Sequence, residues 1–123
     1  MIVLICGDRN WTDRKAIEDF INTLPRGSVI VEGDCRGADR IAGAIGEAKG
    51  FHVYKFQANW SRYGKAAGPI RNEKMIVYGK PDLVVAFHND LSKSRGTRDM
   101  INRAKRHGIP YQVIKSDNQQ AEG

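Results

Sequence analysis

The sequence contains only two cysteines, Cys6 and Cys35, and no long apolar segment. Two cysteines cannot build the disulfide framework that stabilises small secreted domains. The apolar start of the chain, residues 2–6, is far shorter than a bilayer span or the hydrophobic core of a signal peptide. We therefore expect a cytoplasmic protein with no membrane partner.

Several motifs of cofactor and metal chemistry are also absent. Neither the dinucleotide fingerprint GxGxxG nor the phosphate loop GxxxxGK[ST] occurs, which counts against an ordinary dehydrogenase and an ordinary NTPase. The three histidines, His52, His88 and His107, lie far apart, and no HExxH or CxxC occurs. We predict no metal site and no resident cofactor.

The composition is that of one folded domain with a one-sided charge. The chain has 123 residues, with 41% hydrophobic and 28% charged residues. Residues 1–60 hold eight basic and eight acidic side chains, whereas residues 61–123 hold twelve and six, which accounts for the whole net charge of +6. Such a bias attracts polyanions, whether nucleic acid, a phosphorylated metabolite or an acidic partner.

Short apolar runs alternate along the chain with longer segments of helical period. The expected strands are residues 2–6, 28–31, 51–56, 83–87 and 111–114. The expected helices cover 12–24 and 37–50, start at Gly68-Pro69, and run from Thr97 to Gly108. This alternation predicts an α/β fold: a single Rossmann-like, doubly wound domain over residues 1–114, with a five-stranded, mainly parallel sheet and helices on both faces. A flexible polar tail is expected over residues 115–123.

Glycine and polar side chains follow the first, second and fourth strands, at the edge where parallel sheets bind ligands. Each of these turns opens a helix, whose unpaired N–H groups attract anions, and glycine lets a phosphate approach the backbone. Taken singly, each turn is equally well explained by ordinary turn and cap chemistry. Together they predict a nucleotide site. The candidate ligand-binding residues are Gly7, Arg9, Trp11, Gly33, Asp34, Gly37, Ala38, Asp39, Trp60, Arg71, Asn72, Ser94, Gly96 and Thr97.

The connection after the third strand is unusually long. Residues 57–67 show no regular pattern, and such a segment in a compact domain is typical of a lid or binding loop. Trp60 and Tyr63 are suited to stacking on a base, and Arg71 to forking onto a phosphate or carboxylate. The alternative is that the two aromatic rings only anchor the loop and that Arg71 pairs with a neighbouring acid.

Four motifs, in this order, resemble a known family. They are Gly7-x-Arg9-x-Trp11-x-Asp13, Glu32-Gly33-x-x-x-Gly37-Ala38-Asp39, Ala67-Gly68-Pro69-x-Arg71-Asn72 and Ser94-x-Gly96-Thr97. Over residues 1–114 the chain is similar to the YspA-like branch of the SLOG superfamily, which is named from the Smf/DprA DNA-processing proteins and the Lonely Guy phosphoribohydrolases. The resemblance implies a Rossmann-like domain with a pocket for nucleotides or nucleotide-derived ligands such as ADP-ribose or NAD-related molecules, and self-association into a homo-oligomer.

The same resemblance bears on catalysis. The enzymatic branch of the superfamily carries Pro-Gly-Gly-x-Gly-Thr-x-x-Glu, and in this chain Met100 stands in place of that glutamate. A thioether cannot act as an acid or a base, and Asp99 points about 100° away on a helix. We rank binding of a nucleotide-derived ligand first. The alternatives are N-glycosidic hydrolysis or transfer on a nucleotide, using Asp34 or Asp39, and DprA-like binding of single-stranded nucleic acid.

Overall fold

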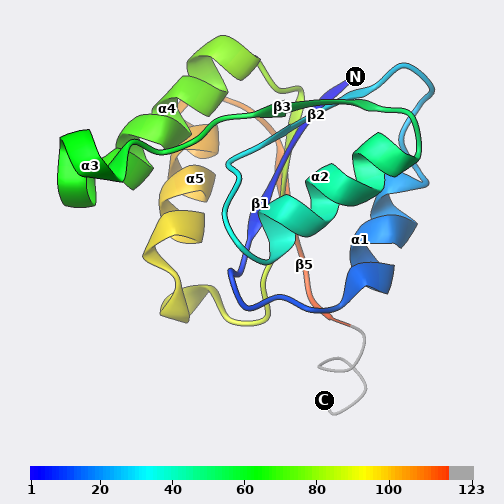
Figure 1. Ribbon diagram of the computed structural model, residues 1–123, viewed down its shortest axis with the longest axis horizontal. Coiled ribbons are helices and arrows are strands. Elements are labelled where there is room, and N and C mark those ends of the chain that lie inside the picture. Colours follow the sequence, from blue (N-terminus) through cyan, green and yellow to red (C-terminus); the bar gives the residue numbers. More distant parts are fainter. Residues whose placement is uncertain (117–123) are drawn as a thin grey trace.

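The computed structural model describes residues 1–116 and contains a central sheet flanked by helices (Figure 1). The elements are β1 (Ile2–Gly7), α1 (Arg14–Ile21), β2 (Val29–Glu32), α2 (Ala38–Ala48), β3 (His52–Lys55), α3 (Trp60–Tyr63), α4 (Ala67–Gly79), β4 (Leu83–Phe87), α5 (Arg95–Arg106) and β5 (Tyr111–Ile114). Two short 3-10 helices cover Gly64–Ala66 and Leu91–Lys93.

The five strands are parallel and lie in the order β3-β2-β1-β4-β5. The chain therefore builds outward from β1 to β3 and then returns to place β4 on the other side of β1. Val3 of β1 pairs with Ile30 on one side and with Leu83 on the other. This arrangement confirms the expected doubly wound sheet, and it puts the reversal of strand order between β1 and β4.

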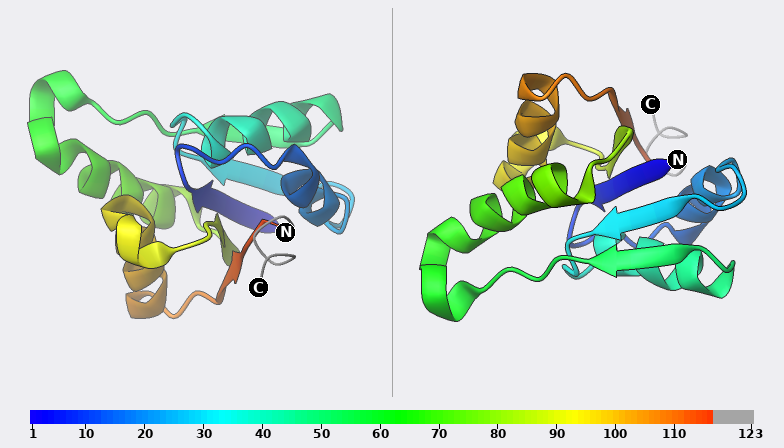
Figure 2. Two further views of the ribbon diagram at one scale, coloured as in Figure 1. Left: turned by 90° about the horizontal axis from the view of Figure 1, so that it is seen from below. Right: turned by 90° about the horizontal axis from the view of Figure 1, so that it is seen from above.

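Helices cover both faces of the sheet (Figure 2). One core lies under α1 and α2 and includes Val3 and Ile5 of β1. The other lies under α4 and α5 and includes Leu4 and Cys6. Because successive side chains of a strand point to opposite faces, β1 must be apolar throughout, as its sequence is. Within residues 1–116, no helix has both the length and the apolar composition needed to cross a membrane.

The four expected helices begin one or two residues from the expected positions, at Arg14, Ala38, Ala67 and Arg95, and in two of them a capping side chain sets the start. Asp13, rather than Thr12, caps α1, because its carboxylate accepts a hydrogen bond from the backbone N–H of Ala16. Ser94 caps α5 by accepting from the N–H of Thr97, so this helix begins at Arg95 rather than at Thr97. In both cases two neighbouring residue types suit the cap position, and the backbone geometry selects one of them.

Residues 57–67 also differ from the expectation of an irregular loop. Trp60–Tyr63 forms the one-turn helix α3, and Gly64–Ala66 continues as a 3-10 turn that leads into α4. The Asn59 side chain starts α3 by accepting from the N–H of Arg62 (3.2 Å). The expected tail, residues 115–123, lies mostly outside the described residues; within them, Ser116 is buried and its N–H donates to the Asn89 side chain.

The interior contains one carboxyl group at the end of β2. Glu32 has no exposed surface, and its Oε1 accepts from the N–H of Asp34. Within residues 1–116 its Oε2 has no hydrogen-bond partner, and α2 passes so close that a side chain at Gly43 would lie 2.3 Å from this oxygen. Burial disfavours the ionised form and raises the pKa of Glu32 from 4.5 to about 7.

We expect Glu32 to make stability fall as pH rises. The folded state holds the Glu32 proton more tightly than the unfolded state, so unfolding is favoured as pH increases from about 4.5 through 7, by up to about 3 kcal/mol. Glu32→Gln should remove most of this slope, raising the free energy of unfolding at pH 8 relative to wild type while changing it little at pH 5. Urea unfolding at both pH values measures the difference. Glu47→Gln, on the exposed side of α2, is the matched control, and an unchanged slope in Glu32→Gln would contradict the assignment.

Candidate ligand-binding site

A cavity of ≈ 350 Å³ opens at the carboxyl ends of β1 and β4, where the strand order reverses. This is the place where open parallel sheets bind their ligands. Its lining comes from five separate segments of the chain. The residues are Cys6, Gly7, Asp8, Arg9, Asn10, Cys35, Asp39, Arg71, Asn72, Met75, His88, Lys93, Ser94, Arg95, Gly96, Thr97 and Met100.

The first turn of α5 forms one wall of the cavity. No atom lies within 4 Å of the position that a side chain at Gly96 would take, so this part of the helix start is open. Lys93 and Arg95 line the cavity beside it and are exposed. The positive end of a 12-residue helix and two cations together form an anion-binding wall.

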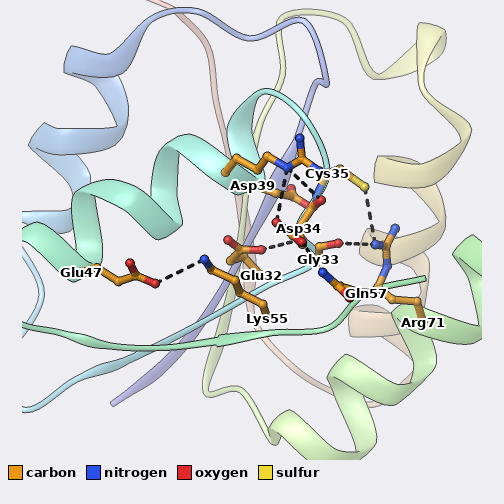
Figure 3. Close-up of polar contacts among 10 residues, drawn as sticks. Glu32, Gly33, Asp34, Cys35, Asp39, Glu47, Lys55, Gln57 and Arg71 are labelled. Carbon is orange, nitrogen blue, oxygen red and sulfur yellow. Dashed lines mark hydrogen bonds and ion pairs between the residues drawn. The ribbon is translucent and has the colours of Figure 1, made fainter. Parts of the chain in front are cut away.

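Arg71 of α4 spans the cavity to the loop after β2 (Figure 3). Its Nη1 donates to the carbonyl oxygen of Gly33 (2.6 Å) and to Cys35 Sγ (3.5 Å), and its Nε donates to the Asn72 side chain (3.0 Å). A side chain at Gly33 would lie 2.7 Å from Nη1, so this contact requires glycine. Arg71 thus holds a backbone carbonyl oxygen, which is neither of the two roles expected for it, and its binding to a phosphate or carboxylate stays a prediction.

Asn72 extends this connection to α5. Its Nδ2 donates to Asp99 (2.9 Å) and to the carbonyl oxygen of Gly96 (3.3 Å). Asp99 also accepts from Arg103 Nε (2.8 Å), so its carboxylate is engaged between two helices. Met100 is the neighbouring residue that lines the cavity, and it is buried. The position of the superfamily glutamate is therefore apolar.

A nearly buried carboxyl group lies beside Arg71 in the same cavity. Asp39, in the first turn of α2, is 6% exposed, and its Oδ2 accepts from the N–H of Cys35 (3.3 Å). Burial raises the pKa of Asp39 to about 6, although the Arg71 guanidinium partly offsets this effect. A carboxylate in this position accepts hydrogen bonds from hydroxyl groups and repels anions. The side of the cavity at the start of α5 is therefore suited to an anion, and the side at Asp39 is suited to a hydroxyl group.

The structure brings most of the candidate residues to this edge of the sheet. Eight of them line the cavity: Gly7, Arg9, Asp39, Arg71, Asn72, Ser94, Gly96 and Thr97. Asp34 and Trp60 line an adjoining cavity. Trp11 belongs to the core instead of flanking a base, because it is 5% exposed and packs edge-on against Phe87 at 5.6 Å between ring centroids.

The remaining candidates have structural contacts: Gly33 holds Arg71, and Gly37 and Ala38 pack against the loop after β1. Gly37 has φ +83°, and a side chain there would lie 2.3 Å from the carbonyl oxygen of Asp8. That oxygen accepts from the N–H of Ala38 (3.1 Å). The positive end of α2 is therefore covered by the loop after β1. Of the starts of α2 and α5, that of α5 is the open one.

Sequence reasoning missed several polar residues of this edge. Lys93 and Arg95 flank the expected Ser94, and their place in the same turn was the available signal. His88 directly follows β4, and its Nδ1 accepts from the N–H of Asp90 (3.0 Å). Within residues 1–116, no three His, Cys, Asp or Glu side chains gather as metal ligands.

The fold is that of a Rossmann-like α/β domain, with a cavity at the reversal of strand order. Residues 1–63 match the YspA, cpYpsA-related SLOG family (YAcAr), and the chain belongs to this family. It is 41% identical to the Gene 61 protein of Mycobacterium phage D29, over 88% of this chain and 91% of that protein. The resemblance seen in the sequence motifs is thereby confirmed.

A solved structure of a longer protein has the same fold. It is the X-ray structure of DNA processing protein A (DprA) from Streptococcus pneumoniae, with a TM-score of 0.56 and 17% sequence identity. The match covers 98% of this chain and 60% of the DprA chain, so this protein spans well under two-thirds of that neighbour's length. At 17% sequence identity, the similarity to DprA establishes a shared fold.

The two thiols should differ sharply in reactivity. Both cysteines line the cavity, but Cys35 is partly exposed, whereas Cys6 is buried and its pKa is raised far above the ordinary value by burial. We expect iodoacetamide to alkylate Cys35 at least about 10-fold faster than Cys6 in the folded protein, because only the exposed thiol can form an accessible thiolate. Intact mass and peptide mapping give the site. Cys35→Ser should stay unmodified until the protein is denatured; equal labelling of both cysteines would refute this.

Proposed function

We propose that the cavity between β1 and β4 binds a nucleotide-derived ligand with a phosphate at the start of α5. The observation that carries this proposal is the open first turn of α5, with Gly96 uncovered and with Lys93 and Arg95 beside it. An exposed phosphate needs such N–H donors and cations. The cavity volume of ≈ 350 Å³ lies in the range of small-molecule sites.

The opposite side of the cavity supports a ribose. Asp39 repels a phosphate and accepts from hydroxyl groups, and Arg71 keeps the local charge balanced. The ligand is therefore oriented, with its phosphate toward α5 and its sugar toward α2. ADP-ribose and NAD-related molecules, the ligands that the resemblance to the SLOG superfamily implies, combine a phosphate with a ribose in this way.

We place binding ahead of N-glycosidic cleavage. Met100 occupies the position of the superfamily glutamate, and Asp99 is held by Asn72 and Arg103. Asp8 and Asp39 are the carboxyl groups that line the cavity, and of these Asp39 is the one predicted from the sequence for such chemistry. Chromatography of each incubated nucleotide separates the two functions, because cleavage releases a free base and binding does not.

We expect nucleotides to stabilise the folded protein. In a thermal-shift panel of AMP, ADP-ribose, NAD and cyclic nucleotides, at least one should raise the unfolding midpoint at millimolar concentration, since ligands that bind only the native state stabilise it. Arg95→Ala should weaken that ligand by about 10-fold, the loss of one charge-assisted hydrogen bond. Arg106→Ala, at the far end of α5, is the matched control and should bind as wild type. No shift with any nucleotide, or equal loss in both variants, would refute the site.

A second candidate function is binding of single-stranded nucleic acid. It is favoured by the exposed cations Arg98, Lys105 and Arg106 on α5, outside the cavity, and by the net charge of residues 61–123. Lys105 also lies over the ring of the partly exposed Tyr111, at 5.3 Å from its centroid. The solved neighbour DprA is described as a DNA processing protein.

The salt dependence of binding tests this second function. Fluorescence anisotropy with a labelled single-stranded oligonucleotide should show affinity that falls about 20-fold between 50 and 200 mM salt if three phosphates are contacted, because counterions are released on binding. Arg98→Glu combined with Arg106→Glu should abolish the signal while leaving nucleotide binding intact. A flat salt response, or no binding at low salt, would exclude the function.

A further inference from the structure

A second cavity adjoins the first along the same edge of the sheet. It has a volume of ≈ 440 Å³ and is lined by Arg9, Asp34, Cys35, Arg36, Arg40 and Trp60. Arg9 and Cys35 line both cavities, so the two cavities meet at these residues. The phosphate and ribose positions proposed above both lie in the first cavity.

Trp60 gives the second cavity an uncovered aromatic surface. Its side chain is 52% exposed, although tryptophan is usually largely buried. One edge of the indole rests near α4, where a side chain at Gly68 would lie 3.4 Å from the ring. Asn59 fixes the short helix on which Trp60 stands. An indole held in place at one edge and exposed over a cavity is a stacking surface for a planar ring.

The rest of the second cavity is positively charged. Arg36 is anchored by bonds from its Nε to the Arg9 carbonyl oxygen (3.1 Å) and from its Nη2 to the Asn10 side chain (2.8 Å). Arg40 approaches Asp34 through Nε, which leaves its terminal amino groups as available donors. Three guanidinium groups thus face a single carboxylate among the lining residues.

The Asp34 carboxylate is already occupied by neighbouring side chains. Its carboxylate accepts from the Gln57 amide (2.8 Å) and from Arg40 (Figure 3), and these bonds lower the pKa of Asp34. It therefore orients Arg40 and the segment before α3. The cavity retains a positive balance beside an aromatic ring, and this combination fits a planar ring that carries a phosphate.

We infer that the two cavities together bind one ligand of the dinucleotide class, with one nucleotide against α5, the second ring stacked on Trp60, and the linking phosphate beside Arg9. This inference rests on the proposed function of the first cavity and extends it by a second subsite. The linkage can be a pyrophosphate or a 3′–5′ phosphodiester, because Arg9, Arg36 and Arg40 recognise the phosphate common to both.

Calorimetric titrations test the second subsite directly. The probes are AMP, NAD and the linear dinucleotide pApA, each with wild type, Trp60→Ala and the control Tyr78→Ala, whose ring is exposed on α4 and lines neither cavity. We expect NAD or pApA to bind wild type at least about 10-fold more tightly than AMP. Trp60→Ala should lose about 10-fold toward the dinucleotide and stay within about twofold for AMP, since stacking is lost on one ring only. Tyr78→Ala should match wild type throughout.

Tryptophan fluorescence supplies an independent readout. Trp11 and Trp60 are the two tryptophans of the chain, and Trp11 is buried. The dinucleotide should therefore quench the exposed fluorophore in wild type, and this quenching should vanish in Trp60→Ala. AMP should quench neither protein.

Each outcome decides one of the two proposals. Tighter binding of NAD alone identifies a pyrophosphate-linked ligand, and tighter binding of pApA alone identifies a phosphodiester-linked one; both support the second subsite. AMP binding that no dinucleotide improves, or equal losses for AMP and dinucleotide in Trp60→Ala, overturns the subsite and leaves the nucleotide site standing. No binding of any probe overturns both.

Discussion

The edge of the sheet that carries the cavity depends on the contact between the Arg71 guanidinium and the carbonyl oxygen of Gly33. Arg71 comes from α4 on one face of the sheet, and Gly33 from the loop that leads to α2 on the other face. A charge-assisted hydrogen bond of 2.6 Å therefore joins the two layers at the edge where the cavity opens. Asn72 extends the same connection to α5, so the three helices around the cavity are held in one arrangement.

The two sides of the cavity differ in charge. Backbone oxygens of the first loop cover the start of α2, whereas the start of α5 is open beside Lys93 and Arg95. Asp39, buried between the loop and Arg71, makes the other side unfavourable for anions. A ligand with an anionic end and a hydroxyl-bearing end satisfies both sides, and the basic second cavity extends this pattern past Arg9 toward Trp60.

The order of strands and helices, which follows from the spacing of apolar residues, was predicted more reliably than the residues at which helices begin. Five apolar runs with helical segments between them allow few arrangements other than a doubly wound parallel sheet, and the position of the polar turns at one edge follows from it. The starts of α1 and α5 were displaced because Thr12 and Asp13, or Ser94 and Thr97, are equally good caps by residue type. The helix α3 was missed because residues 57–67 contain no apolar period, and one capping side chain, Asn59, is enough to start a single turn.

The sequence by itself determined the fold, the edge that carries the polar turns, and the family motifs, since all three depend on residue order along the chain. Only the tertiary structure decided what each polar residue does. It covered the start of α2 and left that of α5 open, turned Glu32 and Trp11 inward, and left Trp60 exposed. The physical reason is that burial and hydrogen bonding depend on which distant segments of the chain come into contact, as the segment at Gly37 does with Asp8. The type of a residue does not specify which distant segment it will contact.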